Sequence, residues 1–290
     1  MVYYITMADK QYIDQEYSVA KRGKNIREDS KTARVARIFS ISFFTFAVLI
    51  SFTLIGFTII FFFSRVEGSS MMMTLNRDYT LYASSGGNNT DAVLVNRRAN
   101  PSRGDIIVVR HYHSFGSNNE GAGNFDFFIK RLIAVGGDSV YFRRHPVQSP
   151  RPGAPQFWYE IHLNGEPIDE YYLHPHWGQN LTYSRVWSYL NENRHASVYA
   201  QFIQFVPERE RFEIVIPQGY MFFMGDNRGG SGVQGSIDLR LKSWDSTAFG
   251  PQPIDRLVGV VADVIHDNMT LPQYLWTQFV NIITFRFLWG

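Results

Sequence analysis

The feature that most restricts the fold of this 290-residue chain is an uncharged apolar run from Ile38 to Phe63. As an α-helix the run would be about 39 Å long, enough to cross the ~30 Å hydrocarbon core of a bilayer. A buried helix of a soluble core seldom contains so long a run without a charge. A cleaved signal peptide has a shorter apolar core, and no A-x-A cleavage site follows this one. We therefore predict a retained transmembrane helix over residues 38–63.

Charge is unevenly distributed around this run. Residues 1–37 contain eight Lys and Arg against five Asp and Glu, whereas the residues just after the run are of mixed charge. Positive segments stay on the cytoplasmic side of a membrane. We therefore predict a basic cytoplasmic segment over 1–37 and an extracytoplasmic domain over 64–290. A net charge of +2 is too small to indicate nucleic acid as the main partner. The apolar run instead predicts the lipid bilayer as a partner.

Beyond Phe63 the pattern changes to short β-prone segments separated by Gly, Pro, Ser and Asn. Residues 105–112, 127–135, 220–224 and 257–265 are examples, and the alternation of Tyr159, Ile161 and Leu163 indicates a half-buried strand. The predicted fold class is mostly β, an antiparallel barrel or sandwich-like domain behind a single transmembrane helix. The aromatic tail Leu271–Gly290 predicts a packed C-terminal helix, with an interfacial helix as the alternative.

The residue types exclude several kinds of active site. The absence of cysteine excludes disulfides, thiolate metal sites and a cysteine nucleophile. The His pairs 111/113 and 174/176 lack the helical spacing of a zinc protease, and no Walker or dinucleotide motif occurs, so we predict neither a metal nor an organic cofactor. No GxSxG elbow is present for a Ser–His–Asp triad.

Two segments together indicate a serine–lysine dyad. The first is VEGSSMMMTL (Val66–Leu75), which taken alone is a turn beyond the membrane with gap-filling methionines. The second is the apolar strand in which Lys130 stands, where a lone lysine is ordinarily a solvated, outward-facing residue. A serine needs a base to act as a nucleophile, and a lysine with a normal pKa of about 10.4 can serve only if burial disfavours its charged form.

The wording and order of seven blocks resemble the bacterial type I signal peptidases, or leader peptidases. The blocks, each followed by the family pattern, are SMMMTL (Ser70–Leu75; SMxPTL), RGDIIVV (Arg103–Val109; RGDIVVF), KRLIAVGGD (Lys130–Asp138; KRVIGLPGD), YEIHLNGEPIDEYYL (Tyr159–Leu173; yxNGxxxxExYl), IPQGYMFFMGDNR (Ile216–Arg228; VPxGxYFxMGDNR), SIDLR (Ser236–Arg240; SxDSR) and FGPQPIDRLVGVV (Phe249–Val261; FGPVPxxxIxGKA).

The resemblance implies a membrane-bound serine endopeptidase that removes N-terminal signal peptides from exported preproteins at the outer face of the bacterial cytoplasmic membrane. It implies Ser70 as the nucleophile and Lys130 as the general base. Cleavage would follow sites of the Ala-x-Ala type, with small residues at positions −1 and −3, and would need no cofactor. The family places a supporting serine, aspartate and arginine in the SxDSR block, which implies Ser236, Asp238 and Arg240.

The sequence departs from the family pattern at several positions. Met73 stands where the family has proline, and Gly68 stands where some members have an oxyanion-hole serine, so Ser69 is a shifted candidate for that role. The interval after GDN is longer than in the family, so either Ser231 or Ser236 could hydrogen-bond the lysine, and we favour Ser236.

Three other interpretations stay open on the sequence. One is a catalytically silent, membrane-anchored relative that acts as a binding module. Another is a structural envelope protein, which leaves the seven ordered blocks unexplained. The third is a specialised processing peptidase with few substrates. The sequence gives no oligomeric state.

Overall fold

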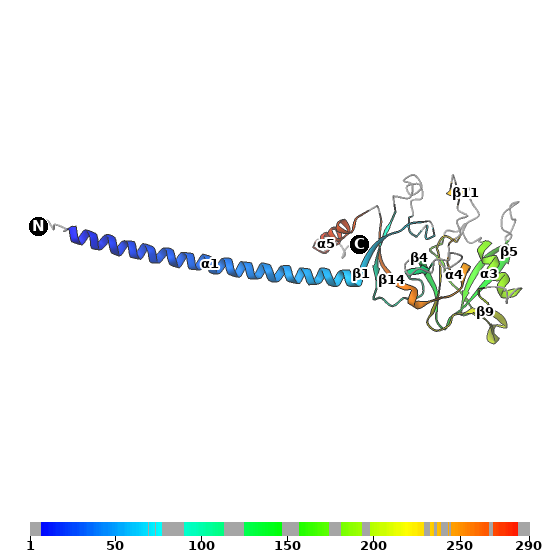
Figure 1. The fold of residues 1–290 in the computed structure, drawn as a ribbon. Helices are drawn as coiled ribbons and strands as arrows, with labels where there is room; N and C mark the ends of the chain where they lie inside the picture. The colour runs from blue at the N-terminus through cyan, green and yellow to red at the C-terminus, as the bar shows by residue number, and fades with distance from the viewer. Residues whose placement is uncertain are drawn as a thin grey trace. The chain divides into compact units, whose positions relative to one another are not determined.

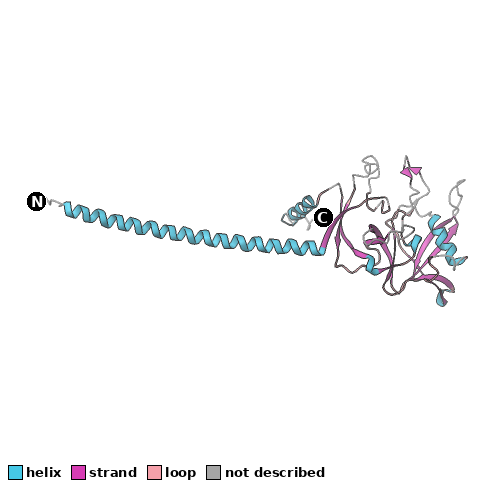
Figure 2. Cartoon of the chain, in the orientation of Figure 1, coloured by secondary structure: helices cyan, strands magenta, loops and turns pink. Residues whose placement is uncertain are grey.

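The computed structural model describes residues 7–68, 70–72, 74–76, 90–112, 125–146, 157–173, 181–192, 198–228, 233–234, 237–238, 243, 245–266 and 269–283. The chain divides into two compact units, Met1–Ile59 and Ile60–Gly290. The first unit is a helix and the second is built mainly of strands, as the secondary-structure colouring of Figure 2 shows. The predicted class, an N-terminal apolar helix followed by a mostly β antiparallel domain, is confirmed.

Helix α1 extends from Met7 to Ile60 (Figure 1). Its part from Lys31 to Ile60 contains an 18-residue window with a mean hydropathy of 2.3 and no buried residue, so it is long and apolar enough to cross a membrane. The helix ends three residues before the apolar run does. Phe61–Arg65 form strand β1, because their backbone pairs with strand β2, Ala92–Asn96, and phenylalanine suits a half-buried strand.

The larger sheet has seven strands in the order β1-β2-β14-β3-β4-β10-β13, and each neighbouring pair is antiparallel. Its other strands are β3 (Ile106–Tyr112), β4 (Phe125–Val135), β10 (Tyr220–Met224), β13 (Gln252–Pro253) and β14 (Leu257–Ile265). The register shifts in β10 and twice in β14, and such bulges bend a strand. The sheet is therefore a curved half-barrel, open between its edge strands β1 and β13.

The smaller sheet has five strands in the order β7-β6-β5-β9-β8. These strands are β5 (Ser139–Pro146), β6 (Phe157–Leu163), β7 (Glu166–Pro167), β8 (Ile203–Val206) and β9 (Arg211–Val215). The remaining elements are the hairpin of β11 (Val233–Gln234) and β12 (Ile237–Asp238), helices α3 (Leu181–Asn191), α4 (Ser246–Phe249) and α5 (Leu271–Ile283), and the single turns η1 (Pro207–Arg209) and η2 (Ile254–Arg256).

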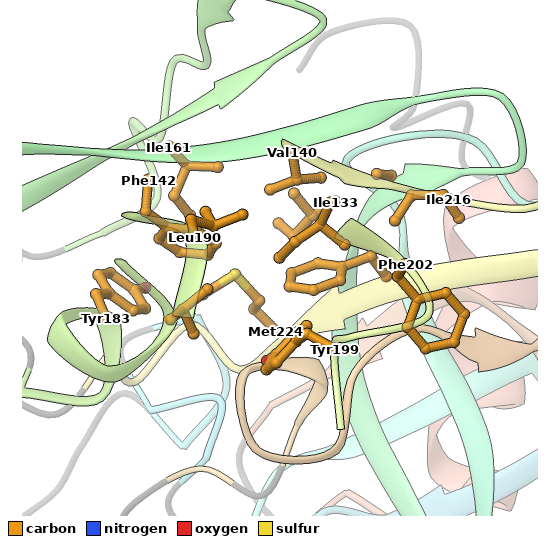
Figure 3. Close-up of a cluster of buried hydrophobic side chains, with 14 of the residues drawn as sticks. Ile133, Val140, Phe142, Ile161, Tyr183, Leu190, Tyr199, Phe202, Ile216 and Met224 are labelled. Atoms are coloured by element: carbon orange, nitrogen blue, oxygen red, sulfur yellow. The ribbon is translucent and has the colours of Figure 1, made fainter. Parts of the chain in front are cut away.

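One apolar core joins the smaller sheet to the larger (Figure 3). Phe142 and Ile161 of the smaller sheet pack with Tyr183 and Leu190 of α3, and Met224 of β10 enters the same cluster from the larger sheet. Each of these side chains is at most 2% exposed. Burying a side chain of this size contributes about 1.5–3 kcal/mol, so the cluster holds the two sheets together as one unit.

The turn from β4 into β5 explains the Gly-Gly-Asp of the third block. A Cβ on Gly136 would lie 2.9 Å from the backbone of Gln218 and Pro217, so no larger side chain fits there. Asp138 closes the turn, because its carboxylate accepts the N–H of Val135 at 2.9 Å. This turn fixes where β4 ends and therefore where its side chains point.

Candidate active site

Ser70 lies in the loop that follows β1, above a turn whose apolar side chains are buried. The N–H of Leu75 donates to the carbonyl of Met71 at 2.9 Å, which closes the turn. Met71 and Met72 are 1% and 2% exposed, so these two residues of the methionine run fill the core beneath Ser70. The carbonyl of Ser70 accepts the N–H of Asn227 at 2.9 Å. The serine is therefore held by its own carbonyl group and by the buried turn that follows it.

A reciprocal pair of hydrogen bonds attaches this loop to the larger sheet. The N–H of Asn76 donates to Oδ2 of Asp91, and the N–H of Asp91 donates to Oδ1 of Asn76, each at 2.7 Å. The Asn76 amide also donates to the carbonyl of Val66 at 3.2 Å. Asn76 has a φ of 55°, a left-handed conformation that asparagine adopts more readily than most residues. Asp91 directly precedes β2, so the clamp holds the Ser70 loop at a fixed distance from the sheet.

Lys130 lies in the middle of β4 and its side chain turns inward. The residue pairs with Ile107 of β3 and is 3% exposed. Its Nζ lies 2.7 Å from Oγ of Ser70 and 3.0 Å from the carbonyl oxygen of Ile129. The Phe128 ring centroid is 5.1 Å from the same nitrogen. The structure therefore brings together the serine and the lysine of the predicted dyad.

The surroundings of Lys130 favour its neutral form. Burial lowers the pKa of the Lys130 amine to about 8, and the negative charges of Asp245 and Asp226 oppose this shift without cancelling it. An amine with a normal pKa near 10.4 is almost wholly protonated at pH 7. The buried amine therefore supplies a proton acceptor beside the Ser70 hydroxyl.

Next to Lys130, Arg131 forms a buried ion pair that links β4 to the nucleophile turn. Its Nε and Nη2 donate to the two oxygens of Asp226 at 2.8 and 2.6 Å, and Asp226 is 1% exposed. The Thr74 hydroxyl donates to the same carboxylate at 2.6 Å. The Tyr172 ring lies 3.8 Å from the Arg131 guanidinium. Arg131 and Asp226 are therefore a buried supporting pair.

Gly225 brings a further loop against Ser70. A Cβ on this residue would overlap the carbonyl oxygen of Ser70 and the hydroxyl of Ser243, so only glycine fits. Its N–H donates to Oδ2 of Asp245 at 3.0 Å, while Oδ1 of Asp245 caps α4 by accepting the N–H of Thr247 at 3.0 Å. The Ser243 Oγ is buried and has no hydrogen-bond partner among the described residues.

Arg228 fixes the wall beside this site. The side chain is 1% exposed, its Nη2 lies 2.6 Å from Oε1 of Glu170, and its Nη1 donates to the Tyr183 hydroxyl at 2.6 Å. The segment before Leu173 is thereby attached to the end of the Ile216–Arg228 block. Within the described residues no group of three or more His, Asp or Glu is arranged to hold a metal ion.

A family model for signal peptidases, peptidase S26, matches residues 37–265. The chain belongs to this family. The signal peptidase I of Bacillus caldolyticus is 27% identical over 207 residues, which are 70% of this chain and 79% of that protein. A crystal structure of a signal peptidase I from Enterococcus faecalis V583 is 19% identical, covers 57% of this chain and 98% of its own, and has a TM-score of 0.27. The resemblance noted in the sequence is confirmed: this is a serine peptidase family that removes signal peptides.

The predicted supporting residues of this signal peptidase fall largely outside the described part of the chain. Ser69, Ser231, Ser236 and Arg240 are not described. Asp238 is described only by its backbone, which pairs with Val233 in the β11–β12 hairpin. The roles predicted for these five residues therefore stay predictions.

Sequence reasoning missed three residues that the structure places around Ser70, namely Asn76, Ser243 and Asp245. A signal for two of them was present. Ser243-Trp244-Asp245-Ser246 matches the Ser-x-Asp-Ser of the family block, and only two residues separate it from Phe249-Gly250. The assignment to Ser236–Arg240 instead left eight residues before that Phe-Gly pair. Asn76 has no comparable signal, because its partner Asp91 is distant in sequence.

Proposed function

We propose that this signal peptidase cleaves exported preproteins at the extracytoplasmic membrane face, with Ser70 as nucleophile and Lys130 as general base. The observation that carries the proposal is the buried Lys130 Nζ at 2.7 Å from the Ser70 Oγ. That distance allows direct proton transfer between the two groups. The lowered pKa of Lys130 supports the same assignment, because a protonated amine could not accept the hydroxyl proton.

In the first step, the neutral Lys130 amine takes the Ser70 hydroxyl proton as Oγ attacks the scissile carbonyl carbon. The resulting oxyanion would be stabilised by the backbone N–H of Ser70, with the Ser69 hydroxyl as the proposed second donor. Lys130 then gives its proton to the leaving amine nitrogen as the C–N bond breaks. This releases the mature protein and leaves the signal peptide esterified to Ser70.

In the second step, Lys130 is neutral again and takes a proton from a water molecule. The water oxygen attacks the ester carbonyl, and the Ser70 oxygen leaves with the proton that Lys130 returns. The products are a signal peptide with a free carboxyl group and the enzyme in its starting state. Both steps are proton transfers and acyl transfers, and neither needs a metal or a redox group.

We propose Ser243 and Asp245 as positioning residues for this chemistry. Both surround Gly225, whose backbone lies against Ser70, and Asp245 acts electrostatically on Lys130. The buried Ser243 hydroxyl is suited to orient the amine once a substrate is bound. The sequence alone suggests other residues for the support of Lys130, and these stay proposals. They are Ser236, Asp238 and Arg240, with Ser231 as the alternative to Ser236.

The substrate class and orientation follow from the anchor and from the resemblance. The basic segment before the apolar part of α1 favours a cytoplasmic N-terminus in the bacterial inner membrane, so residues 64–290 would face outward. We propose that the substrate is held extended, with small side chains at positions −1 and −3 as in Ala-x-Ala. Signal peptides end at this outer face, and Ser70 lies only ten residues beyond Ile60, the end of α1.

The test uses the full chain in detergent with a preprotein that carries an Ala-x-Ala site. Cleavage products are sized and their new N-termini are sequenced. We expect cleavage after the second alanine by the wild type and by Ser102→Ala, an exposed serine far from Lys130 in sequence. Ser70→Ala and Lys130→Ala should each lose at least about 10³-fold in rate. Activity that survives Ser70→Ala refutes the dyad, and an inactive wild type favours a silent relative or a narrower substrate range.

A further inference from the structure

Helix α5 has no charged residue and leaves two of its large apolar side chains, Leu275 and Trp276, exposed. No Asp, Glu, Lys or Arg occurs in Leu271–Ile283. Apolar residues recur at helical spacing at positions 271, 275, 279 and 282, and polar residues at 273, 277 and 281. Leu275 and Trp276 are 38% and 66% exposed. A helix that packs on a protein core has the opposite arrangement.

Among the described residues, a hydrogen bond from Tyr274 attaches α5 to the sheet. Tyr274 lies on the same side of the helix as Thr277 and Gln278, which follow it by three and four residues. Its hydroxyl donates to Oδ2 of Asp263 at 2.6 Å. Asp263 belongs to β14, the strand that precedes α5. This hydrogen bond fixes the Tyr274 side of the helix toward β14. Trp276 lies about 160° around the helix from Tyr274 and is therefore directed outward, with Leu275 between the two.

The register of the sheet places this attachment close to the end of the membrane helix. Asp263 pairs with Leu94 of β2, and Leu94 pairs with Phe63 of β1. Phe63 follows Ile60, the last residue of α1, by three positions. At about 3.3 Å per residue and about 4.8 Å between strands, Asp263 lies within about 14 Å of Ile60. The attachment point of α5 is therefore within about 14 Å of the residue where the membrane helix ends, which is close enough for the helix to reach the headgroup region of a bilayer that ends near Ile60.

Basic residues lie at this same edge of the sheet. The N–H of Arg97 donates to the carbonyl of Ile60 at 2.8 Å, and its guanidinium lies 4.9 Å from the Phe62 ring centroid. Arg97 and Arg98 are exposed. Arginines at this height suit the phosphate groups of lipids. The part of the chain nearest the membrane helix thus presents cations, and α5 presents an uncharged apolar side.

We propose that α5 is an interfacial helix that inserts Leu275 and Trp276 into the outer leaflet and forms a second attachment of the domain to the bilayer. Amphipathic helices with tryptophan lie in the headgroup–acyl boundary in this way. The 13 described residues of α5 give a helix of about 20 Å, which is shorter than the ~30 Å hydrocarbon core and suits a helix that lies in the interface. The helix lies beyond the matched residues 37–265, so the family model does not account for it.

Cysteine labelling of the full chain tests this proposal directly, because the natural sequence contains no cysteine. Leu275→Cys and Trp276→Cys place a fluorophore on the outward side, and Thr277→Cys places the same fluorophore on the polar side as the matched control. The labelled proteins are reconstituted in vesicles of phosphatidylethanolamine and phosphatidylglycerol. We expect nitroxide lipids to quench the labels at 275 and 276 several-fold more than the label at 277, and aqueous iodide to show the reverse order.

Two outcomes would overturn the proposal. Equal iodide quenching at all three positions would show that α5 lies in water. Protection of the labels at 275 and 276 from both quenchers would show that protein, such as a second copy of the chain, covers this side. Neither readout requires peptide cleavage, so a failure here is independent of the catalytic assignment.

A second measurement separates a membrane role from a folding role. Leu275→Glu and Trp276→Glu should lower cleavage of a membrane-inserted preprotein several-fold and leave cleavage of a short soluble peptide unchanged, with Thr277→Glu as control. An equal loss on both substrates would contradict a role at the bilayer.

Discussion

The lowered pKa of Lys130 predicts a specific pH dependence of cleavage. With a pKa of about 8, about one tenth of the Lys130 amines are neutral at pH 7 and about nine tenths at pH 9. The value of kcat/KM should therefore rise about tenfold between these pH values and level off above pH 9. An unburied lysine, with a pKa near 10.4, would keep rising tenfold per pH unit through that range.

The measurement is the initial rate of cleavage of a short fluorogenic Ala-x-Ala peptide at substrate concentrations well below KM. Such a peptide has no titratable side chain near the scissile bond, so the profile reports the free enzyme. Circular dichroism at each pH checks that the protein stays folded. A profile that is flat from pH 7 to 9, or that still rises steeply at pH 10, would refute the assignment of a buried Lys130 as the base.

Asp245→Asn gives the matched control for this profile. The Asp245 carboxylate raises the pKa of Lys130, so its neutralisation should lower that pKa and shift the acid limb to lower pH. The fraction of maximal activity present at pH 7 then increases, although the plateau can fall because Asp245 also caps α4. A shift toward higher pH would contradict the electrostatic account.

Two further substitutions test the framework around the dyad. Arg131→Ala leaves the Asp226 carboxylate buried without its cation, which should cost about 3–5 kcal/mol in the free energy of unfolding measured with urea. Arg131→Lys should recover part of that loss, and equal stability of all three proteins would contradict the prediction. Gly225→Ala forces a methyl group against the Ser70 carbonyl, so kcat should fall at least about tenfold through misplacement of the nucleophile. An unchanged kcat in Gly225→Ala would show that the loop can move aside.

The sequence predicts the class of the fold from a strongly marked local signal, and the blocks that resemble signal peptidases select Ser70 and Lys130, which the structure places side by side. An uncharged run as long as 38–63 has few structural solutions, and Lys130 is conspicuous in an apolar strand. The residue at which helix α1 ends could not be predicted from such signals. Phe61–Phe63 are as apolar as the residues before them, and only their backbone pairing with β2 makes them a strand.

The supporting residues were harder to predict because they depend on distant contacts and on spacing. Asn76 acts through Asp91, and nothing in their local sequence marks the pair. Ser243 and Asp245 stand in a second Ser-x-Asp pattern after that of Ser236 and Asp238, and choosing between the two requires knowing which loop reaches Gly225. A motif match gives residue types in order, whereas the fold decides which copy lies beside the nucleophile.

The clamp between Asn76 and Asp91 also affects which changes in chain length this protein can accept during evolution. It fixes both ends of the segment 77–90, so the length of that segment is uncoupled from the position of Ser70. When the ends of a loop are already held together, each doubling of its length costs only about 0.6 kcal/mol in closure entropy. We therefore expect a change in the number of residues between Asn76 and Asp91 to leave Ser70 in place, because the two hydrogen bonds lie outside the changed segment. The segment is thus where we expect lineages to diverge, and where a reporter peptide can be introduced with little loss of stability.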